Sequence, residues 1–258
     1  MTTTDLYKRL TGDTILNCRH EVLAEIHNPS PALRGFQGGC SDGKRYYYQI
    51  LMHYDHPDRL RDYGRIAKLD LQTGRVVQWS EDLYLDHAND MTYHPQSDSI
   101  IVCHNKPHPQ RITFLNAQTL TPYKQIDLPF SIYCIEYSAE RDLYAVGLSG
   151  TREFRFLNAD LCPIEEATHR QTPLADRCVK QGMCADKDLL YFILWDGRHK
   201  SEPDFQSRII LHDWSGTYKG TLHFDVGLQE PESISIVNGE ILAVCGHDHP
   251  IVYKFIPQ

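Results

Sequence analysis

The sequence has no excess of basic residues and no long apolar run. Lysine and arginine together number 26, against 34 aspartates and glutamates, and the formal net charge is -8. Phosphate groups bind to clustered Lys and Arg, so we expect no nucleic-acid partner. A membrane helix requires roughly 20 consecutive apolar residues, and no run approaches that length, so we also expect no membrane partner. The segment Met1–Lys8 lacks the apolar core of a signal peptide.

Motifs for several common chemistries are missing as well. The sequence contains no GxSxG elbow, no glycine-rich phosphate loop and no HExxH helix. Its eight cysteines form no CxxC pair, which leaves a zinc knuckle without support. Five of them lie within apolar, strand-like runs, where cysteine behaves as a small buried hydrophobe: Cys40, Cys103, Cys134, Cys184 and Cys245. We therefore expect reduced thiols and a cytoplasmic protein.

Helical periodicity is almost absent. Only Thr4–Leu10, just ahead of Gly12, is expected to form a short helix. The rest of the chain consists of short runs rich in Tyr, Ile, Val and Phe, and these runs are broken by Gly, Asp, Asn and Pro. This pattern is typical of strands and turns at regular spacing.

The expected strands repeat in groups of four. Gln37–Asp42 aligns with Gln181–Asp186, and each segment is followed by a strand, a long loop and two further strands. Units of this kind match the length of a four-stranded propeller blade, ~40–50 residues. Three more units begin at Asn89, Tyr133 and Glu232. The repeat therefore predicts blades arranged around a central axis.

The last of these units is one strand short, because the chain ends just after Ile251–Phe255. The N-terminal segment Glu21–Ile26 can supply the missing strand and close the ring, whereas an open stack would leave unpaired edges. In the unit that begins at Tyr133, the fourth strand is expected at Pro163–Ala167. We predict a single all-β domain over residues 1–258, a five-bladed β-propeller closed by an N-terminal strand. A β-sandwich or an irregular all-β fold is the alternative.

The innermost strands of a propeller all begin on one face, around the central channel. Their first positions in this chain are polar or amphipathic residues: Gln37, Asn89, Tyr133, Gln181 and Glu232. A ring of hydrogen-bonding side chains at the mouth of an otherwise packed channel suits a small polar ligand. We therefore place the candidate site at this mouth, with a small molecule or a peptide as the expected partner.

Loops expected on the same face are rich in histidine. They contain seven of the 14 histidines: His53, His56, His104, His108, His199, His247 and His249. His87, in another loop, faces the same way. A functional cluster and ordinary solvated loop residues are both consistent with this pattern. His247-Asp248-His249 comes closest to a chelating triplet but lies on a turn, and no HxH or HxxxH lies on one strand, so we expect no metal and no other cofactor.

Two segments resemble a known family. Phe36-Gln37-Gly38 precedes a tyrosine-rich strand and Tyr63-Gly64-Arg65, and Leu71-Gln72-Thr73-Gly74-Arg75-Val76 follows. This order is similar to the first blade of plant-type glutaminyl cyclases and bacterial glutamine cyclotransferases. The segment from Glu232 to Ala243 resembles the family's Asn-Glu-Leu-Glu segment and the strand after it. The resemblance implies a five-bladed propeller that closes an N-terminal glutamine to pyroglutamate and releases ammonia.

The chain departs from this family at the start of the second unit. The family's unit opens Glu-Gly-Leu-Thr, whereas this chain has Asn89-Asp90-Met91-Thr92. An amide cannot act as a general base. Either Asp90 or Glu232 does the proton work, or the reaction has changed, or catalysis is absent.

Two hypotheses for the function follow. The first is an enzyme acting on a small amine, amide or peptide end, with Glu232 as the leading acid or base, since a carboxyl group withdrawn from water has a raised pKa. Asp90 and His87 are the other catalytic candidates. The candidate substrate-binding residues are Gln37, Asn89, Tyr133, Gln181, Trp195, His53, His104 and His247. The second hypothesis is a non-catalytic propeller module that binds a peptide or protein on the same face.

Overall fold

A computed structural model of the chain describes residues 2–27, 30, 33–53, 62–172, 178–196, 207–227, 229–246 and 249–258. Of the candidate site residues, His247 lies outside this part of the chain, as do His56 and His199 among the loop histidines. The expected short helix is confirmed as α1, Thr3–Arg9. Thr2 caps it, because its hydroxyl accepts the N–H of Asp5 at 3.3 Å.

Nearly all of the remaining regular structure is β-strand. The first antiparallel unit contains β2 (Leu33–Ser41), β3 (Tyr46–His53), β4 (Tyr63–Asp70) and β5 (Arg75–Trp79), and the short β6 (Leu83–Tyr84) pairs with β4. The second contains β7 (Asp90–His94), β8 (Ser99–Cys103), β9 (Arg111–Asn116) and β10 (Pro122–Asp127). The third contains β11 (Ile132–Ser138), β12 (Leu143–Leu148), β13 (Glu153–Asn158) and β14 (His169–Arg170).

The last two units share one eight-stranded sheet. Its strands are β15 (Val179–Ala185), β16 (Leu189–Trp195), β17 (Ser207–Asp213), β18 (Tyr218–Phe224), β1 (Thr14–Glu25), β21 (Pro250–Pro257), β20 (Glu240–Gly246) and β19 (Glu230–Val237). The N-terminal strand β1 joins the two halves. Its residues Cys18–Glu25 pair antiparallel with β21, and Thr14–Asn17 pair parallel with β18.

The pairing predicted for the N-terminal segment is therefore confirmed, since Glu21 lies opposite Lys254 and Glu25 lies opposite Ile251. The parallel pairing with β18 was not predicted. One expectation is wrong: Pro163 makes only an isolated bridge with Leu157, and the fourth strand of the third unit is β14 instead. Proline has no backbone N–H to donate, which makes it a poor member of a ladder.

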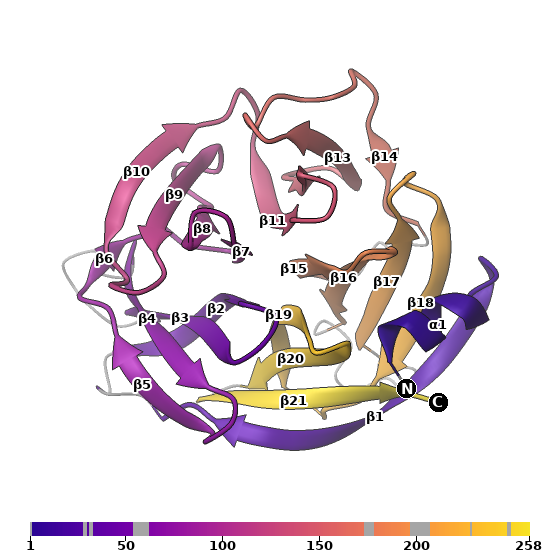
Figure 1. Ribbon diagram of the computed structural model, residues 1–258, viewed down its shortest axis with the longest axis horizontal. Coiled ribbons are helices and arrows are strands. Elements are labelled where there is room, and N and C mark those ends of the chain that lie inside the picture. The colour runs from indigo at the N-terminus through magenta and orange to yellow at the C-terminus, as the bar shows by residue number, and fades with distance from the viewer. Residues whose placement is uncertain are drawn as a thin grey trace.

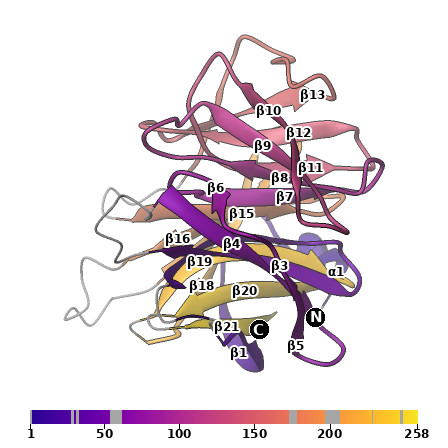
Figure 2. The ribbon, with the colours of Figure 1, turned by 90° about the vertical axis from the view of Figure 1, so that its left-hand side faces the viewer.

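The units surround a common axis. The first strand of each unit lies nearest the middle of Figure 1, and the last strands lie at the rim. The inner strands β2, β7, β11, β15 and β19 contact one another in that order, and β19 contacts β2. Both views place the two chain ends close together (Figures 1 and 2), and the Arg9 guanidinium donates to the carbonyl of Gln258 at 3.2 Å.

The hydrophobic core lies between the units rather than on the axis. Each of its apolar clusters forms between two neighbouring units; between the first and second, for example, Tyr48 and Ile66 pack against Met91 and Ile100. Full burial of one large apolar side chain stabilises the fold by about 1.5–3 kcal/mol. Packing between neighbours therefore holds each unit at its angle around the axis.

The axis itself is polar, because the inner strands expose unpaired backbone groups there. Side chains replace the missing ladder partners: Asp90 Oδ2 accepts the N–H groups of Ile135 at 3.2 Å and Met183 at 3.1 Å. Thr92 Oγ1 similarly accepts the N–H of Tyr137 at 3.0 Å. These contacts cross from the second unit to the third and fourth, so they brace the ring of inner strands.

Two glycines make room for Asp90. A Cβ at Gly38 would lie 2.2 Å from the Cα of Asp90, and a Cβ at Gly182 would lie 2.9 Å from its Oδ1. The backbones of β2 and β15 approach the aspartate closely only because both positions lack a side chain. The glycines in the repeated segments therefore serve the axial packing.

Candidate functional site

The five residues predicted to ring the axis lie on or next to the inner strands and are largely buried. Gln37, Asn89, Gln181 and Glu232 are each 6–8% exposed and Tyr133 is 5% exposed. Asn89 donates through Nδ2 to the carbonyl of Tyr133 at 2.8 Å. Gly38 and Gly182, which follow the two glutamines, both approach Asp90, and Gly182 also approaches the carbonyl of Glu232. The structure thus brings the five residues around one axis, and we call them the mouth ring.

Glu232 has a carboxylate neighbour that sequence reasoning missed. Glu230 lies two residues earlier on β19 and accepts a hydrogen bond from Gln181 Nε2 at 2.7 Å. Burial raises the pKa of Glu232 well above its usual value, and the negative charge of Glu230 raises it further. Strand alternation could not have found Glu230, because the pairing of β19 with β20 shifts register between Pro231 and Ser233. The mouth ring therefore contains a carboxyl group with a raised pKa, and a second acidic side chain, Glu230, lies beside it.

Asn89 has both ends of its amide engaged. Nδ2 donates to Tyr133, and Oδ1 accepts from Asn105 Nδ2 at 3.0 Å. An amide held at both ends has a fixed orientation. A ligand would meet Asn89 as a rigid part of the wall.

Tyr133 is held from two sides. Its hydroxyl accepts from Gln171 Nε2 at 2.6 Å, and Lys180 Nζ lies 4.3 Å from the centre of its ring. Lys180 also donates to the carbonyls of Leu148 and Thr151, and burial lowers its pKa. The positive charge of Lys180 therefore lies against Tyr133, at the start of the neighbouring strand.

Asp90 was expected to exchange protons with a ligand, but the structure places it inside the ring of strands. It has no exposed surface, and its Oδ2 is used by two backbone N–H groups. Its Oδ1 has no hydrogen-bond partner among the described residues, and burial raises the pKa of the carboxyl well above its usual value. Asp90 is an internal brace below the mouth ring, so the catalytic role expected for it is corrected.

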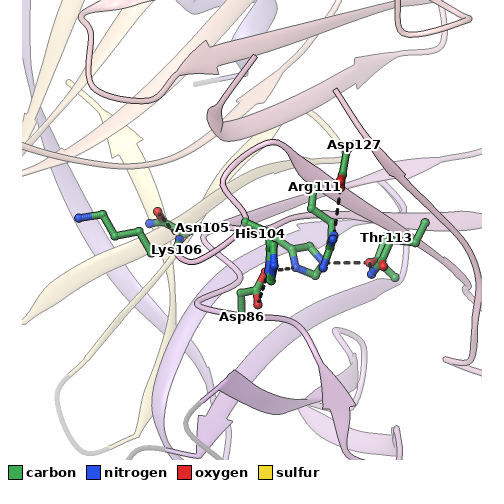
Figure 3. A network of polar contacts seen from close by, with 9 residues as sticks. Asp86, His104, Asn105, Lys106, Arg111, Thr113 and Asp127 are labelled. Atoms are coloured by element: carbon green, nitrogen blue, oxygen red, sulfur yellow. Dashed lines mark hydrogen bonds and ion pairs between the residues drawn. The ribbon is translucent and has the colours of Figure 1, made fainter. Parts of the chain in front are cut away.

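The candidate histidines occupy different environments. The His87 side chain is exposed, although the protein atoms crowded around it lower its pKa. His104 is fully buried, and both ring nitrogens have partners, Asp86 at 2.8 Å and Thr113 at 2.8 Å (Figure 3). The expectation that His104 binds substrate directly is therefore corrected, because no ring atom is left for a ligand.

The remaining candidates end the second strands of their units, each opposite the first residue of an inner strand. His53 ends β3 and contacts Asp82 through Nε2 at 3.0 Å, with Arg65 on the same carboxylate. Trp195 ends β16, one strand out from the axis, where it lies opposite Val179. Neither residue belongs to the mouth ring.

Three further findings concern metal-ligand groups, apolar helices and disulfides among the described residues. Among them, no group of three His, Cys, Asp or Glu residues could hold a metal ion. No helix in the described part of the chain is long and apolar enough to cross a membrane. All eight cysteines are free thiols, and the five expected in apolar strands are buried, which raises the pKa of each.

The fold is an all-β arrangement of four-stranded antiparallel sheets that matches β-propeller structures. The Myxococcus xanthus glutaminyl cyclase matches with a TM-score of 0.64 and 10% identity, over 95% of this chain and 99% of that one. A Bacteroides fragilis protein described as exported matches with a TM-score of 0.53 and 9% identity, over 95% of this chain and 100% of that one. The β-propeller domain of Myceliophteria thermophila Cps50 (Swd1) covers 88% of this chain and 67% of its own, with a TM-score of 0.45 and 10% identity.

The resemblance to glutaminyl cyclases that two sequence segments suggested is thus confirmed at the level of the fold. No protein-family model and no curated protein sequence matches the chain. At 10% identity the likeness describes the backbone and leaves the chemistry of the mouth ring to its own residues.

Proposed function

We propose that the chain is a single-domain, five-bladed β-propeller, closed by β1, whose mouth ring catalyses acid–base chemistry on a small amine, amide or peptide end. The blade count is supported by the succession of inner strands from β2 to β19 and back to β2. Closure by β1 is supported by its pairing with β21. The favoured reaction is related to the cyclisation of an N-terminal glutamine.

One observation carries this proposal: the Glu230–Glu232 pair at the start of β19. Two carboxyl groups whose environments separate their protonation states are a common basis for acid–base catalysis. Burial and the neighbouring Glu230 raise the pKa of Glu232 well above its usual value, which favours the protonated form that a general acid needs. Glu230, fixed by Gln181, offers negative charge to a cationic amine.

The proposed reaction balances without a cofactor. The α-ammonium group of the substrate first loses one proton to solvent. The neutral α-amino nitrogen then forms a bond to its own side-chain amide carbon, and the bond from that carbon to the amide nitrogen breaks. Glu232 donates its proton to the departing nitrogen, which leaves as ammonia, and the attacking amine returns a proton to Glu232. Gln37 and the walls at Asn89 and Tyr133 would orient the carbonyl group, and His87 would be the second proton carrier.

A second function, a binding module for a peptide or protein, is favoured by a different observation. Asn89 stands where the family has Glu, and both ends of its amide are already used by protein groups. A ring whose polar groups bond to one another can present a fixed surface without reacting. In this alternative the same face would hold a peptide unchanged.

Ammonia release from glutaminyl peptides tests the proposal directly. Glu232→Gln keeps the shape and cannot carry a proton, so we expect a loss of roughly 10²–10⁴-fold in turnover, the usual contribution of general acid–base catalysis. Glu21→Gln on the outer strand β1 is the matched control and should behave as wild type, with thermal melts reporting folding for both. Equal turnover in wild type and Glu232→Gln would remove Glu232 from the mechanism. No turnover by wild type on any amine or amide, together with peptide binding at the mouth, would favour the binding module.

A further inference from the structure

The turn between β6 and β7 carries His87 and leads directly into Asn89. Asp86 within this turn has a left-handed backbone, with φ of 53°, and its side chain is fully buried. Burial by itself would raise the pKa of Asp86, but hydrogen bonds from His104, Tyr84 and His108 outweigh it and lower the pKa. The turn is thus fastened to the second unit through one ionised, buried carboxylate.

His104 makes a shorter contact with Asp86 than His108 does and lies between two partners, as Figure 3 shows. Gln125 donates its amide N–H to Thr113 Oγ1 at 2.9 Å, so the Thr113 hydroxyl hydrogen is free to point at His104 Nε2, 2.8 Å away. Nε2 then accepts, the ring proton lies on Nδ1, and Nδ1 donates to Asp86 Oδ2 at 2.8 Å. Burial lowers the pKa of His104, in keeping with a neutral ring. The hydrogen bonds from Gln125 to Asp86 therefore run in one consistent direction.

The residue after His104 makes a second contact with the same turn. Asn105 donates from Nδ2 to Asn89 Oδ1 at 3.0 Å. The end of β8 thus holds the segment from Asp86 to Asn89 at both of its ends. His87 lies between these two fixed points and is exposed.

We propose that His104 and Asp86 are positioning residues that set the places of His87 and Asn89 at the mouth ring. For its effect on turnover this inference rests on the proposed function, but the geometry can be measured without turnover. A purely structural role would cost stability wherever the chain of hydrogen bonds is cut. A positioning role depends on which contact of His104 is cut.

Two substitutions separate the contacts of His104. His104→Asn keeps an amide nitrogen at the place of Nδ1, so it retains the donor to Asp86 and loses Thr113. His104→Gln reaches instead to the place of Nε2, so it retains Thr113 and loses Asp86. Each variant loses one buried hydrogen bond, so both melting temperatures should fall. The fall should be larger in His104→Gln, because its lost partner is the ionised carboxylate of Asp86.

The readout is NMR of the His87 ring titration and the Asn89 side-chain amide signal in the full chain. In His104→Gln we expect the His87 pKa to rise toward about 6.5, its ordinary value, and the Asn89 amide signal to move, while His104→Asn keeps both near wild type. Asp127→Asn, which breaks only the nearby ion pair with Arg111 (Figure 3), is the control that should change neither signal. Similar signals in both His104 variants, whether shifted or unshifted, would overturn the proposal.

Asp86→Asn supplies the same test if His104→Gln does not fold, since it weakens the turn from the other partner and should also release His87. In the ammonia assay, misplacement of the mouth in His104→Gln should lower kcat by roughly 10²-fold. If the NMR shifts occur and wild type has no turnover, the positioning role stands and the proposed reaction fails. If wild type turns over and the His87 and Asn89 signals stay fixed in His104→Gln and Asp86→Asn, the reaction stands and the positioning role fails.

Discussion

Replacing Glu136 with glutamine should change how the stability of the fold depends on pH. Glu136 is a partly buried residue of β11 near the axis, where burial raises its pKa from 4.5 to about 8 despite hydrogen bonds from Thr92 and the backbone of Ala185. The folded protein therefore keeps a proton that the unfolded chain releases above about pH 4.5. Stability due to this group is fully present below pH 4.5 and is lost as the pH rises to about 8.

The size of this loss follows from the pKa change. At about 1.4 kcal/mol for each tenfold change in a proton equilibrium, the rise from 4.5 to about 8 corresponds to about 5 kcal/mol. Glu136 retains some exposure to water, which screens the charge, so we expect roughly half of this in the free energy of unfolding. Glu136→Gln cannot ionise and should therefore gain about 2–3 kcal/mol relative to wild type between pH 5 and pH 8.5.

Urea unfolding at pH 5, 7 and 8.5 measures this difference. Glu140→Gln, an exposed substitution in the following turn, is the control and should follow the wild-type pH dependence. Parallel pH profiles for wild type and Glu136→Gln would refute the reasoning. The reasoning would also fail if wild type and Glu136→Gln both became more stable from pH 5 to pH 8.5.

Two further substitutions test the axial packing. Gly38→Ala would place a Cβ 2.2 Å from the Cα of Asp90 and should cost at least 1–3 kcal/mol, the usual cost of overpacking. Gly43→Ala meets open space, so it should cost only the ~1–2 kcal/mol of its left-handed backbone. Chemical denaturation of both variants measures the two costs. Asp90→Asn keeps an oxygen for the N–H groups of Ile135 and Met183 but cannot ionise. The variant should therefore melt within a few degrees of wild type at pH 5 and at a higher temperature than wild type at pH 8.5. A lower melting temperature than wild type at pH 8.5 would contradict a raised pKa for Asp90.

The four-stranded units could be predicted because their strands and turns recur in the same order. The missing last strand also pointed correctly to Glu21–Ile26, because an unpaired edge after β21 required a partner. The parallel pairing of Thr14–Asn17 with β18 could not be predicted in the same way, since it lies outside the repeat. The prediction of a strand at Pro163–Ala167 was wrong because it relied on the length of the segment and ignored that proline has no N–H to donate.

In the candidate site, too, some residues could be placed from the sequence and others could not. Equivalent positions of a repeat lie on a circle, so the mouth ring could be located from Gln37, Asn89, Tyr133, Gln181 and Glu232. The environment of His104 could not, because its partners Asp86 and Thr113 belong to separate strands and turns, and nothing local distinguishes a buried loop histidine from a solvated one. The place of Glu230 could not be predicted either, because β19 shifts register between Pro231 and Ser233 and the contact with Gln181 depends on the neighbouring unit.

Residues at different positions along the inner strands differ in how many strands they hold together. One position below the mouth ring, Asp90 replaces ladder partners for two neighbouring strands, so a change there disturbs several units together. At the mouth ring, Gln181 donates one hydrogen bond to Glu230, and Asn89 donates one to the backbone carbonyl of Tyr133. Substitution there costs little of the fold, because each loss is one net hydrogen bond of about 1 kcal/mol. The proposed acid–base chemistry therefore depends on the carboxyl pair on β19, because the amide of Asn89 cannot carry a proton.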